Sequence, residues 1–174
     1  MKYRLASIVS AIALASCGSD SGTTGSPPAP TVASNINVAA SSVGATATAT
    51  FNAASAGNLI DENIATTWIS SPGSPIIIDF GSVIDIDSLE INKVNSLLST
   101  SSPPDILVEL SADDVTYESS GITLSSGADI PCISQTFGGS VIDCSFTPYS
   151  ARYIRITTQN GKSFEFQDIE AISN

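Results

Sequence analysis

The side chains of this sequence that could do covalent or proton-transfer chemistry are few. The chain has three cysteines and no histidine, so His-based acid–base catalysis and His-ligated metal sites are excluded. Cys132 and Cys144 show no C-x-x-C spacing and no basic neighbour that would lower a thiol pKa, which argues against a redox or nucleophilic pair. Asp113 and Asp114 could be paired catalytic carboxylates, but they fall in a predicted hairpin turn, where Asp is favoured for local hydrogen bonds. We therefore expect no enzyme activity.

The third cysteine, Cys17, follows a segment typical of an export signal. Two basic residues precede an apolar run over residues 5–14, which is shorter than the roughly 20 residues needed to span a bilayer. Residues 14–17 (LASC) resemble the lipobox of bacterial lipoproteins. The resemblance implies that residues 1–16 are a removed signal peptide and that Cys17 is lipidated, for example with palmitate. The protein would then be exported and lipid-anchored in the bacterial cell envelope, at the outer membrane or cell surface. The alternative is an ordinary secretory signal with an unrelated cysteine near its end.

Removal of the signal peptide leaves a strongly acidic chain. Its four basic and 17 acidic residues give a formal charge of −13, against −11 for the full sequence. Such a surface repels nucleic-acid phosphates and anionic lipid headgroups. We therefore expect no nucleic-acid partner, and membrane contact through the lipid anchor only.

The two cysteines that remain after lipidation predict a disulfide. Cys132 and Cys144 belong to an exported chain, where thiols are most simply paired. The segment between them contains Gln135, Gly138 and Gly139, which predicts a hairpin with a Gly-Gly turn. Closing this loop is worth about 2–3 kcal/mol in the chain-entropy description of disulfide stabilisation.

Composition divides the mature chain into a linker and one domain. Residues 17–34 are almost entirely Gly, Ser, Thr, Pro and Ala after the cysteine, which predicts a flexible tether. Over residues 35–174, short runs rich in Ile, Val, Thr and aromatics alternate with turn residues, a pattern typical of an all-β sandwich or barrel. The expected strands are residues 36–39, 75–80, 89–94, 106–110, 130–133, 141–146, 153–158 and 166–172.

Side-chain alternation in these strands predicts which residues face the core. Leu89 and Ile91 share one face of their strand and should point inward. In the later strand, Ile154 and Ile156 should face inward and Arg155 outward.

Five segments in order resemble the discoidin family, the coagulation factor V/VIII type C domains. Residues 61–68 (DENIATTW) resemble its D-G-N-x-x-T-x-W motif, and residues 76–81 (IIIDFG) its I-x-I-D-L-G strand. Residues 106–117 resemble its V-x-x-S-x-D-G-x-x-W hairpin, residues 150–156 its A-R-Y-V-R-I strand and residues 167–172 its terminal strand. The resemblance implies a galactose-binding-like jelly-roll β-sandwich of about eight strands, the fold of family 32 carbohydrate-binding modules.

The resemblance also implies a structural calcium ion in the loop before Trp68. Calcium prefers six to eight oxygen ligands, and the matching positions are Asp61 as carboxylate, Asn63 as carbonyl donor and Thr66 as hydroxyl and carbonyl ligand. Asp168 holds the position where the family usually has Glu, and Glu170 is the fallback. Glu62 replaces the family's Gly, which could alter the loop backbone. The alternative is a metal-free turn held by Asx hydrogen bonds.

Three further residues have both a functional and a structural interpretation. Trp68 could stack on a sugar, but its place in the motif favours core packing beside the metal loop. Arg152 and Arg155 could contact a ligand, but their match to the family strand favours structural ion pairs.

Galactose-binding members commonly use a His, which this chain lacks, so that chemistry cannot be transferred to it. Replacement loops are residues 95–105 and 158–164. The candidate ligand-binding residues are Asn95, Gln159, Asn160, Lys162 and Phe164, which offer polar donors and an aromatic ring for a sugar. An ordinary polar loop is the alternative.

Together these features predict a lipid-anchored, non-catalytic cell-surface module that binds glycans. The alternative is a structural or adhesion lipoprotein whose sandwich binds another envelope or extracellular protein.

Overall fold

The computed structural model describes residues 35–94, 106–121, 129–130, 134–138, 140–159, 161 and 163–174. Cys17, the predicted signal peptide and the linker lie outside these residues, so lipidation stays a prediction. Residues Ala33–Asn174 form one compact unit, and a chain beginning at Ala33 therefore keeps every described strand. Within the described part, no helix has the length and apolar character needed to cross a membrane.

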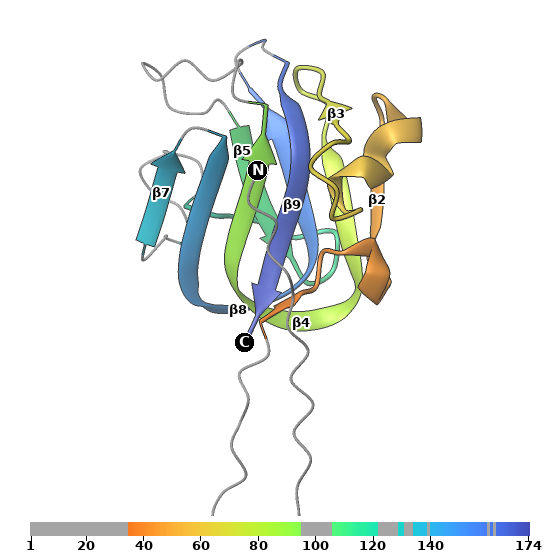
Figure 1. Cartoon of the computed structure of the whole chain (residues 1–174). Coiled ribbons are helices and arrows are strands. Elements are labelled where there is room, and N and C mark those ends of the chain that lie inside the picture. Colours follow the sequence, from red (N-terminus) through yellow and green to blue (C-terminus); the bar gives the residue numbers. More distant parts are fainter. Residues whose placement is uncertain are drawn as a thin grey trace, which may run out of the picture. The chain divides into compact units, whose positions relative to one another are not determined.

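The described residues form nine strands and two short 3-10 helices (Figure 1). All strand pairs are antiparallel. The elements in order are β1 (Ile36–Asn37), η1 (Ser41–Val43), β2 (Thr46–Ala49), η2 (Ala53–Leu59), β3 (Trp68–Ile69), β4 (Ile76–Lys93), β5 (Ile106–Ser111), β6 (Glu118–Ser119), β7 (Ser134–Gly138), β8 (Val141–Thr158) and β9 (Glu165–Ser173).

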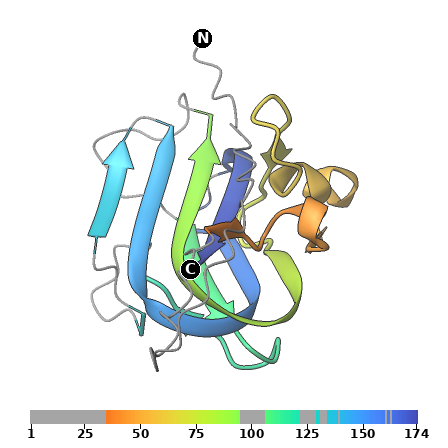
Figure 2. The same cartoon turned by 60° about the horizontal axis from the view of Figure 1, so that its bottom comes forward.

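Two long strands, β4 and β8, bend and connect the two layers. They pair along both halves, with register shifts between Asp79 and Ile84 and between Ile86 and Ser88. Gly81 has a φ of +83°, a conformation that glycine adopts without steric cost, and its N–H donates to the Asp79 carboxylate at 2.7 Å. Both arms of β4 reach the top of the view in Figure 1, whereas Figure 2 brings its bend forward.

Each half of the bent strands belongs to a different layer. The first half of β4 and the second half of β8 lie with β2, β5 and β6. The second half of β4 and the first half of β8 lie with β7 and β9, and β1 and β3 follow each other along the far edge of β9. The predicted β-sandwich is therefore confirmed.

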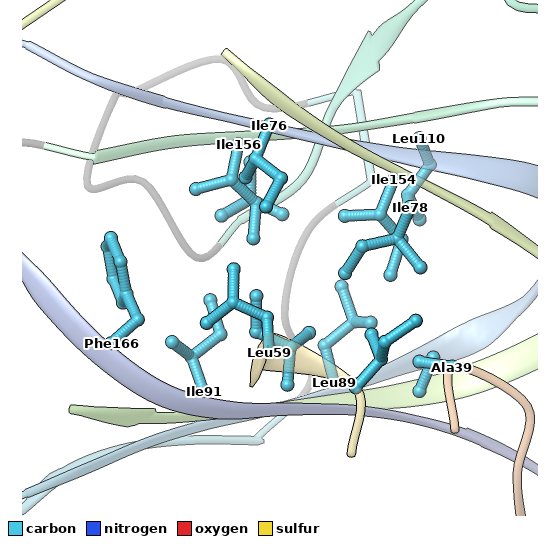
Figure 3. Close-up of a cluster of buried hydrophobic side chains, with 14 of the residues drawn as sticks. Ala39, Leu59, Ile76, Ile78, Leu89, Ile91, Leu110, Ile154, Ile156 and Phe166 are labelled. Atoms are coloured by element: carbon cyan, nitrogen blue, oxygen red, sulfur yellow. The ribbon is translucent and has the colours of Figure 1, made fainter. Parts of the chain in front are cut away.

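The core lies between these layers (Figure 3). Alternate residues of each strand point inward, because successive side chains of a strand face opposite sides. Leu89, Ile91, Ile154 and Ile156 are buried as predicted, and Arg155 faces outward. Burying each such aliphatic side chain contributes about 1.5–3 kcal/mol. The labelled residues of Figure 3 come from both layers, from η2 and from the turn after β1: Ala39, Leu59, Ile76, Ile78, Leu89, Ile91, Leu110, Ile154, Ile156 and Phe166.

The predicted hairpin before β8 is present, because Gly138 pairs with Val141. Cys144 is buried in β8, but Cys132 lies outside the described residues, so the disulfide between them stays a prediction. Of the predicted strand over residues 130–133, Ile130 forms an isolated parallel bridge with Ser120, and the rest lies outside the described residues.

The sandwich has two distinct ends. The start of β9 lies beside the end of β4, where Phe166 pairs with Lys93, so residues 158–165 are at this end. We call it the loop end. β1 pairs with the last residues of β9, Ile36 with Ser173, at the opposite end. The chain therefore enters the sandwich at the end away from residues 158–165.

Candidate functional site

A β-bulge in β9 sets the direction of the Asp168 side chain. Phe166 pairs with Lys93 and Asp168 with Asn92, so Gln167 is an extra residue in β9. Bulges of this kind redirect a side chain locally and are common beside functional sites. The Gln167 amide donates to the Ile64 carbonyl at 2.7 Å, which holds the loop over residues 61–67 against β9. Asp168 is 3% exposed in this arrangement.

The loop over residues 61–66 is organised around the Asp61 carboxylate and Asn63. The Asp61 carboxylate accepts hydrogen bonds from the Asn63 N–H at 3.0 Å and from the Thr66 hydroxyl at 2.9 Å. The Asn63 side-chain oxygen accepts from the Ala65 N–H at 3.1 Å, and its carbonyl accepts from the Thr66 N–H at 3.0 Å. The loop thus folds through Asx turns and gathers three of the predicted oxygen donors.

Glu62 has a left-handed backbone conformation, which glycine adopts without steric cost. Its φ is +59°, in the left-handed region that costs a non-glycine residue about 1–2 kcal/mol. Its carboxylate accepts a hydrogen bond from the Ser42 hydroxyl at 2.7 Å. The replacement of Gly by Glu therefore adds strain and a negative charge to the loop and leaves its turn in place.

Asp168 is a buried carboxylate with an unsatisfied oxygen. Its Oδ1 has no hydrogen-bond partner in the described structure. Burial raises the pKa of Asp168 to about 6, and the negative charges of Glu170, Asp61 and Glu62 add to the shift, whereas a backbone hydrogen bond from Ile169 opposes it. Asp168 is therefore a buried carboxylate whose ionised form is disfavoured by the acidic side chains near it.

Glu170 lies on β9 directly opposite Glu90 of β4. Burial raises the pKa of Glu170, and the charges of Glu90 and Glu62 raise it further. Like charges directly opposite each other across strands are destabilising. Glu170 thus extends the negative potential around Asp168.

Trp68 is a core residue, as its motif position predicted. It is 1% exposed, and its ring stacks on Phe166 with centroids 6.2 Å apart and an interplanar angle of 20°. Its indole N–H donates to the Phe51 carbonyl at 3.2 Å. The ring is therefore not a surface for a sugar, and it fixes the position of the Phe51 backbone.

The two strand arginines form ion pairs, also as predicted. Arg152 makes a two-pronged contact with Asp79, at 2.8 and 2.9 Å, and this hydrogen bonding lowers the pKa of Asp79. Arg155 pairs with Glu109 at 2.7 Å and lies 3.7 Å from the centroid of the Tyr117 ring. Neither guanidinium is offered to a ligand in this arrangement.

Asp113 caps the hairpin turn rather than serving as a catalytic carboxylate. It accepts hydrogen bonds from the N–H groups of Val115 and Thr116 at 2.9 and 2.8 Å. Its pKa is lowered mainly by these two bonds, and Asp114 follows with a φ of +62°. The predicted turn is confirmed.

The predicted ligand residues divide into three groups. Asn95, Asn160 and Lys162 lie outside the described residues, so their role stays a prediction. Gln159 is exposed at the loop end. The prediction for Phe164 is wrong: it is 3% exposed and packs against Phe166, with ring centroids 6.2 Å apart.

Two hydrogen bonds with Ser70 hold the backbone of Phe164 in place. The Phe164 N–H donates to the Ser70 hydroxyl at 2.7 Å, and the Ser70 N–H donates to the Phe164 carbonyl at 2.8 Å. A second contact joins the same two segments, from the Thr158 hydroxyl to the Ser71 carbonyl at 3.1 Å. Residues 70–73 therefore form part of the loop end.

Comparison with known proteins decides the family. The sequence matches the F5/8 type C domain over residues 37–171, which is most of the chain. The chain belongs to the F5/8 type C domain family. The family indicated by the five sequence motifs is thus confirmed.

Solved structures similar to this F5/8 type C domain are carbohydrate-binding modules. CpGH89CBM32-6, produced by Clostridium perfringens, has a TM-score of 0.63 at 16% identity, over 80% of this chain and 100% of that chain. Chitosan-binding module 1 of a chitosanase/glucanase from Paenibacillus sp. IK-5 has a TM-score of 0.55 at 19% identity, over 79% and 99%. The CBM32 of AlyQ, in complex with 4,5-unsaturated mannuronic acid, has a TM-score of 0.53 at 25% identity, over 74% and 94%. No curated protein sequence matches the chain.

The donor set of this F5/8 type C domain fits calcium by its chemistry. Asp61, Asn63 and Thr66 supply carboxylate, carbonyl and hydroxyl oxygens, and Asp168 supplies the unsatisfied oxygen; calcium binds oxygens of all these kinds. In the described residues, no group of three or more His, Cys, Asp or Glu side chains is placed to hold a metal. An ion here would therefore depend on neutral oxygens as well as carboxylates.

The sequence did not reveal one exposed aromatic of this F5/8 type C domain. Phe51 is 41% exposed, and Ile69, in the strand next to it, is 46% exposed. Phe51 stands in a segment rich in Thr, Ala and Asn, outside any predicted strand. An isolated aromatic in a polar segment is the only sequence signal that could have indicated it.

Proposed function

We propose that this protein is a lipid-anchored, non-catalytic module that binds glycans through the loop end of its sandwich. The observation that carries the proposal is the similarity of the whole described fold to carbohydrate-binding modules, one of them in complex with a sugar acid. The loop end supports it, because Gln159 is exposed there and the exposed Phe51 follows the end of β2 at Ala49, which pairs with Ile76. Gln159, with the predicted residues Asn95, Asn160 and Lys162, would hydrogen-bond sugar hydroxyls.

Display at a surface would follow from the predicted lipid anchor. Cys17 would carry the lipid, and residues 17–34 would form the tether.

Calcium is proposed as a structural ion of the loop before Trp68. Asp61, Asn63, Thr66 and Asp168 would hold it, and Glu170 would add negative potential beside it. The unsatisfied Oδ1 of the buried Asp168 supports this assignment. The ion would neutralise the gathered carboxylates and stabilise the loop.

A glycan array probed with the chain from Ala33 tests the proposed function. Saturable binding to a glycan, weakened by Gln159→Ala or by Asn160→Ala, is the expected result. Asp143→Asn, an exposed change in β8, is the matched control and should bind as the parent does. If the protein binds no glycan on the array and crosslinking in cells recovers an envelope protein, the proposed function is wrong and adhesion to a protein is supported instead.

A further inference from the structure

Phe51 and Ile69 are exposed side chains on neighbouring, tightly held backbone segments. The Phe51 carbonyl accepts the indole N–H of Trp68 at 3.2 Å, and the Asn52 amide donates to the Ile69 carbonyl at 2.9 Å. These two bonds join residues 51–52 to β3. Two of the seven large hydrophobic residues that the described structure exposes thus stand on adjoining backbone segments.

The backbone beside Phe51 is held by several local hydrogen bonds. Asn52 has a φ of +51°, in the left-handed region, and its carbonyl accepts from the Ser55 N–H at 3.0 Å and the Ser55 hydroxyl at 3.1 Å. Asn58 donates to the Thr67 carbonyl at 2.8 Å, which secures the segment leading into β3. Strained backbone of this kind persists where the surrounding bonds over-determine it, and it concentrates at functional sites. A side chain held in place beforehand also loses less conformational freedom on binding.

This pair adjoins the loop end. Ile69 precedes Ser70, which is clamped in both directions to Phe164. The same segment continues to Gly73, whose N–H donates to the Thr158 carbonyl at 3.0 Å. Phe51 and Ile69 therefore border the segment over residues 158–165.

A carboxylate lies beside the apolar pair. Ile69 of β3 pairs directly with Glu165 of β9. Because Trp68 and Phe166 of the neighbouring pair are buried inward, the Ile69 and Glu165 side chains both face outward. Side chains directly opposite in an antiparallel pair have Cβ atoms about 4.5–5.5 Å apart. An apolar surface is thus bordered by a negative charge on a chain whose net charge is −11.

We infer that Phe51 and Ile69 form a platform for the apolar face of a pyranose ring, and that Glu165 makes this platform selective for neutral or amino-substituted glycans. We call Phe51 and Ile69 the platform. Sugar rings present C–H groups on one face, which pack on aromatic and aliphatic side chains. Glu165 accepts hydrogen bonds from hydroxyl groups or from the ammonium of an amino sugar, and it repels uronates and sialic acids. The inference rests on the proposed function and specifies the ligand class of that site.

The test measures binding of the chain from Ala33 to three oligosaccharides of equal length by calorimetry: N-acetylglucosamine, glucosamine and mannuronate oligomers. The variants are Phe51→Ala, Phe51→Tyr and Glu165→Gln, and Val115→Ala is the matched control because that side chain is 83% exposed in a different turn. Phe51→Ala keeps the carbonyl that accepts the Trp68 indole, so the melting temperature should stay close to that of the parent.

The neutral or amino oligomer should bind and the mannuronate oligomer should not. Phe51→Ala should weaken binding at least tenfold, whereas Phe51→Tyr and Val115→Ala should bind as the parent does. Glu165→Gln should weaken glucosamine binding severalfold more than N-acetylglucosamine binding. Preferential binding of mannuronate would overturn the ligand class, and unchanged affinity of a folded Phe51→Ala variant for a bound glycan would overturn the platform. A parent that binds no glycan on the array contradicts the proposed function itself, which separates the two failures.

Discussion

Replacement of Asp168 by Asn should stabilise the metal-free protein at neutral pH and abolish its response to calcium. The ionised Asp168 is buried, has an oxygen without a partner in the described structure, and lies near other carboxylates. Asparagine has nearly the same shape and no charge. Its amide can donate to the Glu170 carboxylate, as the protonated Asp168 does. The substitution therefore removes a repulsion in the metal-free state and a ligand in the calcium-bound state.

The magnitude follows from the shift in the Asp168 pKa. The pKa is raised from 3.8 to about 6 in the folded protein, and each pKa unit corresponds to about 1.4 kcal/mol. Because the folded pKa is the higher one, the native state holds the Asp168 proton more tightly than the unfolded state does. The stabilisation that protonated Asp168 gives the native state is complete below pH 3.8 and is lost as the pH rises through about 6. The unfolding free energy of metal-free Asp168→Asn should therefore exceed that of the parent by up to about 3 kcal/mol at pH 7 and match it near pH 3.5. For a domain of this size the gain corresponds to roughly 10 °C in Tm.

The assay is urea unfolding of chelator-treated protein between pH 3.5 and pH 8, repeated with calcium. With calcium at about 100 times its Kd, the unfolding free energy of the parent should rise by about 2.7 kcal/mol, and that of the variant should not change. The parent should then be about as stable as the variant, or more stable. Asp85→Asn, which removes an exposed carboxylate of β4 and keeps an oxygen for the Ser150 hydroxyl, is the control and should follow the parent in both conditions. A metal-free Asp168→Asn variant that is less stable than the parent at pH 7 would refute the reasoning, because the carboxylate would then have a favourable partner.

Three further variants test other parts of the structure. Asp79→Asn removes the two-pronged contact with Arg152 and should lower the unfolding free energy by about 1 kcal/mol at pH 7. Because the folded pKa of Asp79 lies below 3.8, this stabilisation is present above pH 3.8. It is lost as the pH falls through the folded pKa, where the unfolding free energies of parent and variant should converge. Equal stabilities at pH 7 would contradict the role of this pair. Trp68→Phe keeps most of the ring that packs on Phe166 but removes the indole donor to the Phe51 carbonyl, so urea unfolding should show a loss of about 1–3 kcal/mol; no loss would contradict that hydrogen bond. Cys132→Ala with Cys144→Ala should lower stability by about 2–3 kcal/mol if the two form the predicted disulfide, and thiol titration of the unfolded parent without reductant should find neither cysteine free.

The family and the core were predictable because they depend on local patterns. Leu89, Ile91, Ile154 and Ile156 alternate with polar residues, and that alternation alone places them inward. The continuity of β4 was not predictable in the same way. The polar residues around Gly81 are equally compatible with a turn between two strands and with a bend inside one strand, and only pairing with β8 on both sides of the bend decides between them.

The site was predictable only where a motif carried it. Asp61, Asn63 and Thr66 belong to one short segment, so their mutual hydrogen bonds follow from local sequence. The choice between Asp168 and Glu170 depends on a bulge that arises from pairing with β4, which no local pattern encodes. The error on Phe164 was avoidable, because Phe164 and Phe166 are two residues apart and in extended chain share one face.

The loop over residues 61–66, where calcium is proposed, and the proposed platform are connected along a short stretch of chain. Thr66 donates to Asp61 within the loop, and two residues later the Trp68 indole holds the carbonyl of Phe51. Asn52 in turn donates to the Ile69 carbonyl. An ion that fixes Asp61 and Thr66 would therefore also fix the frame on which Phe51 and Ile69 stand, although it would not touch the sugar. In this chain the proposed ion and the proposed binding surface would thus share one hydrogen-bonded frame, in which Glu62 and Asn52 both have positive φ values.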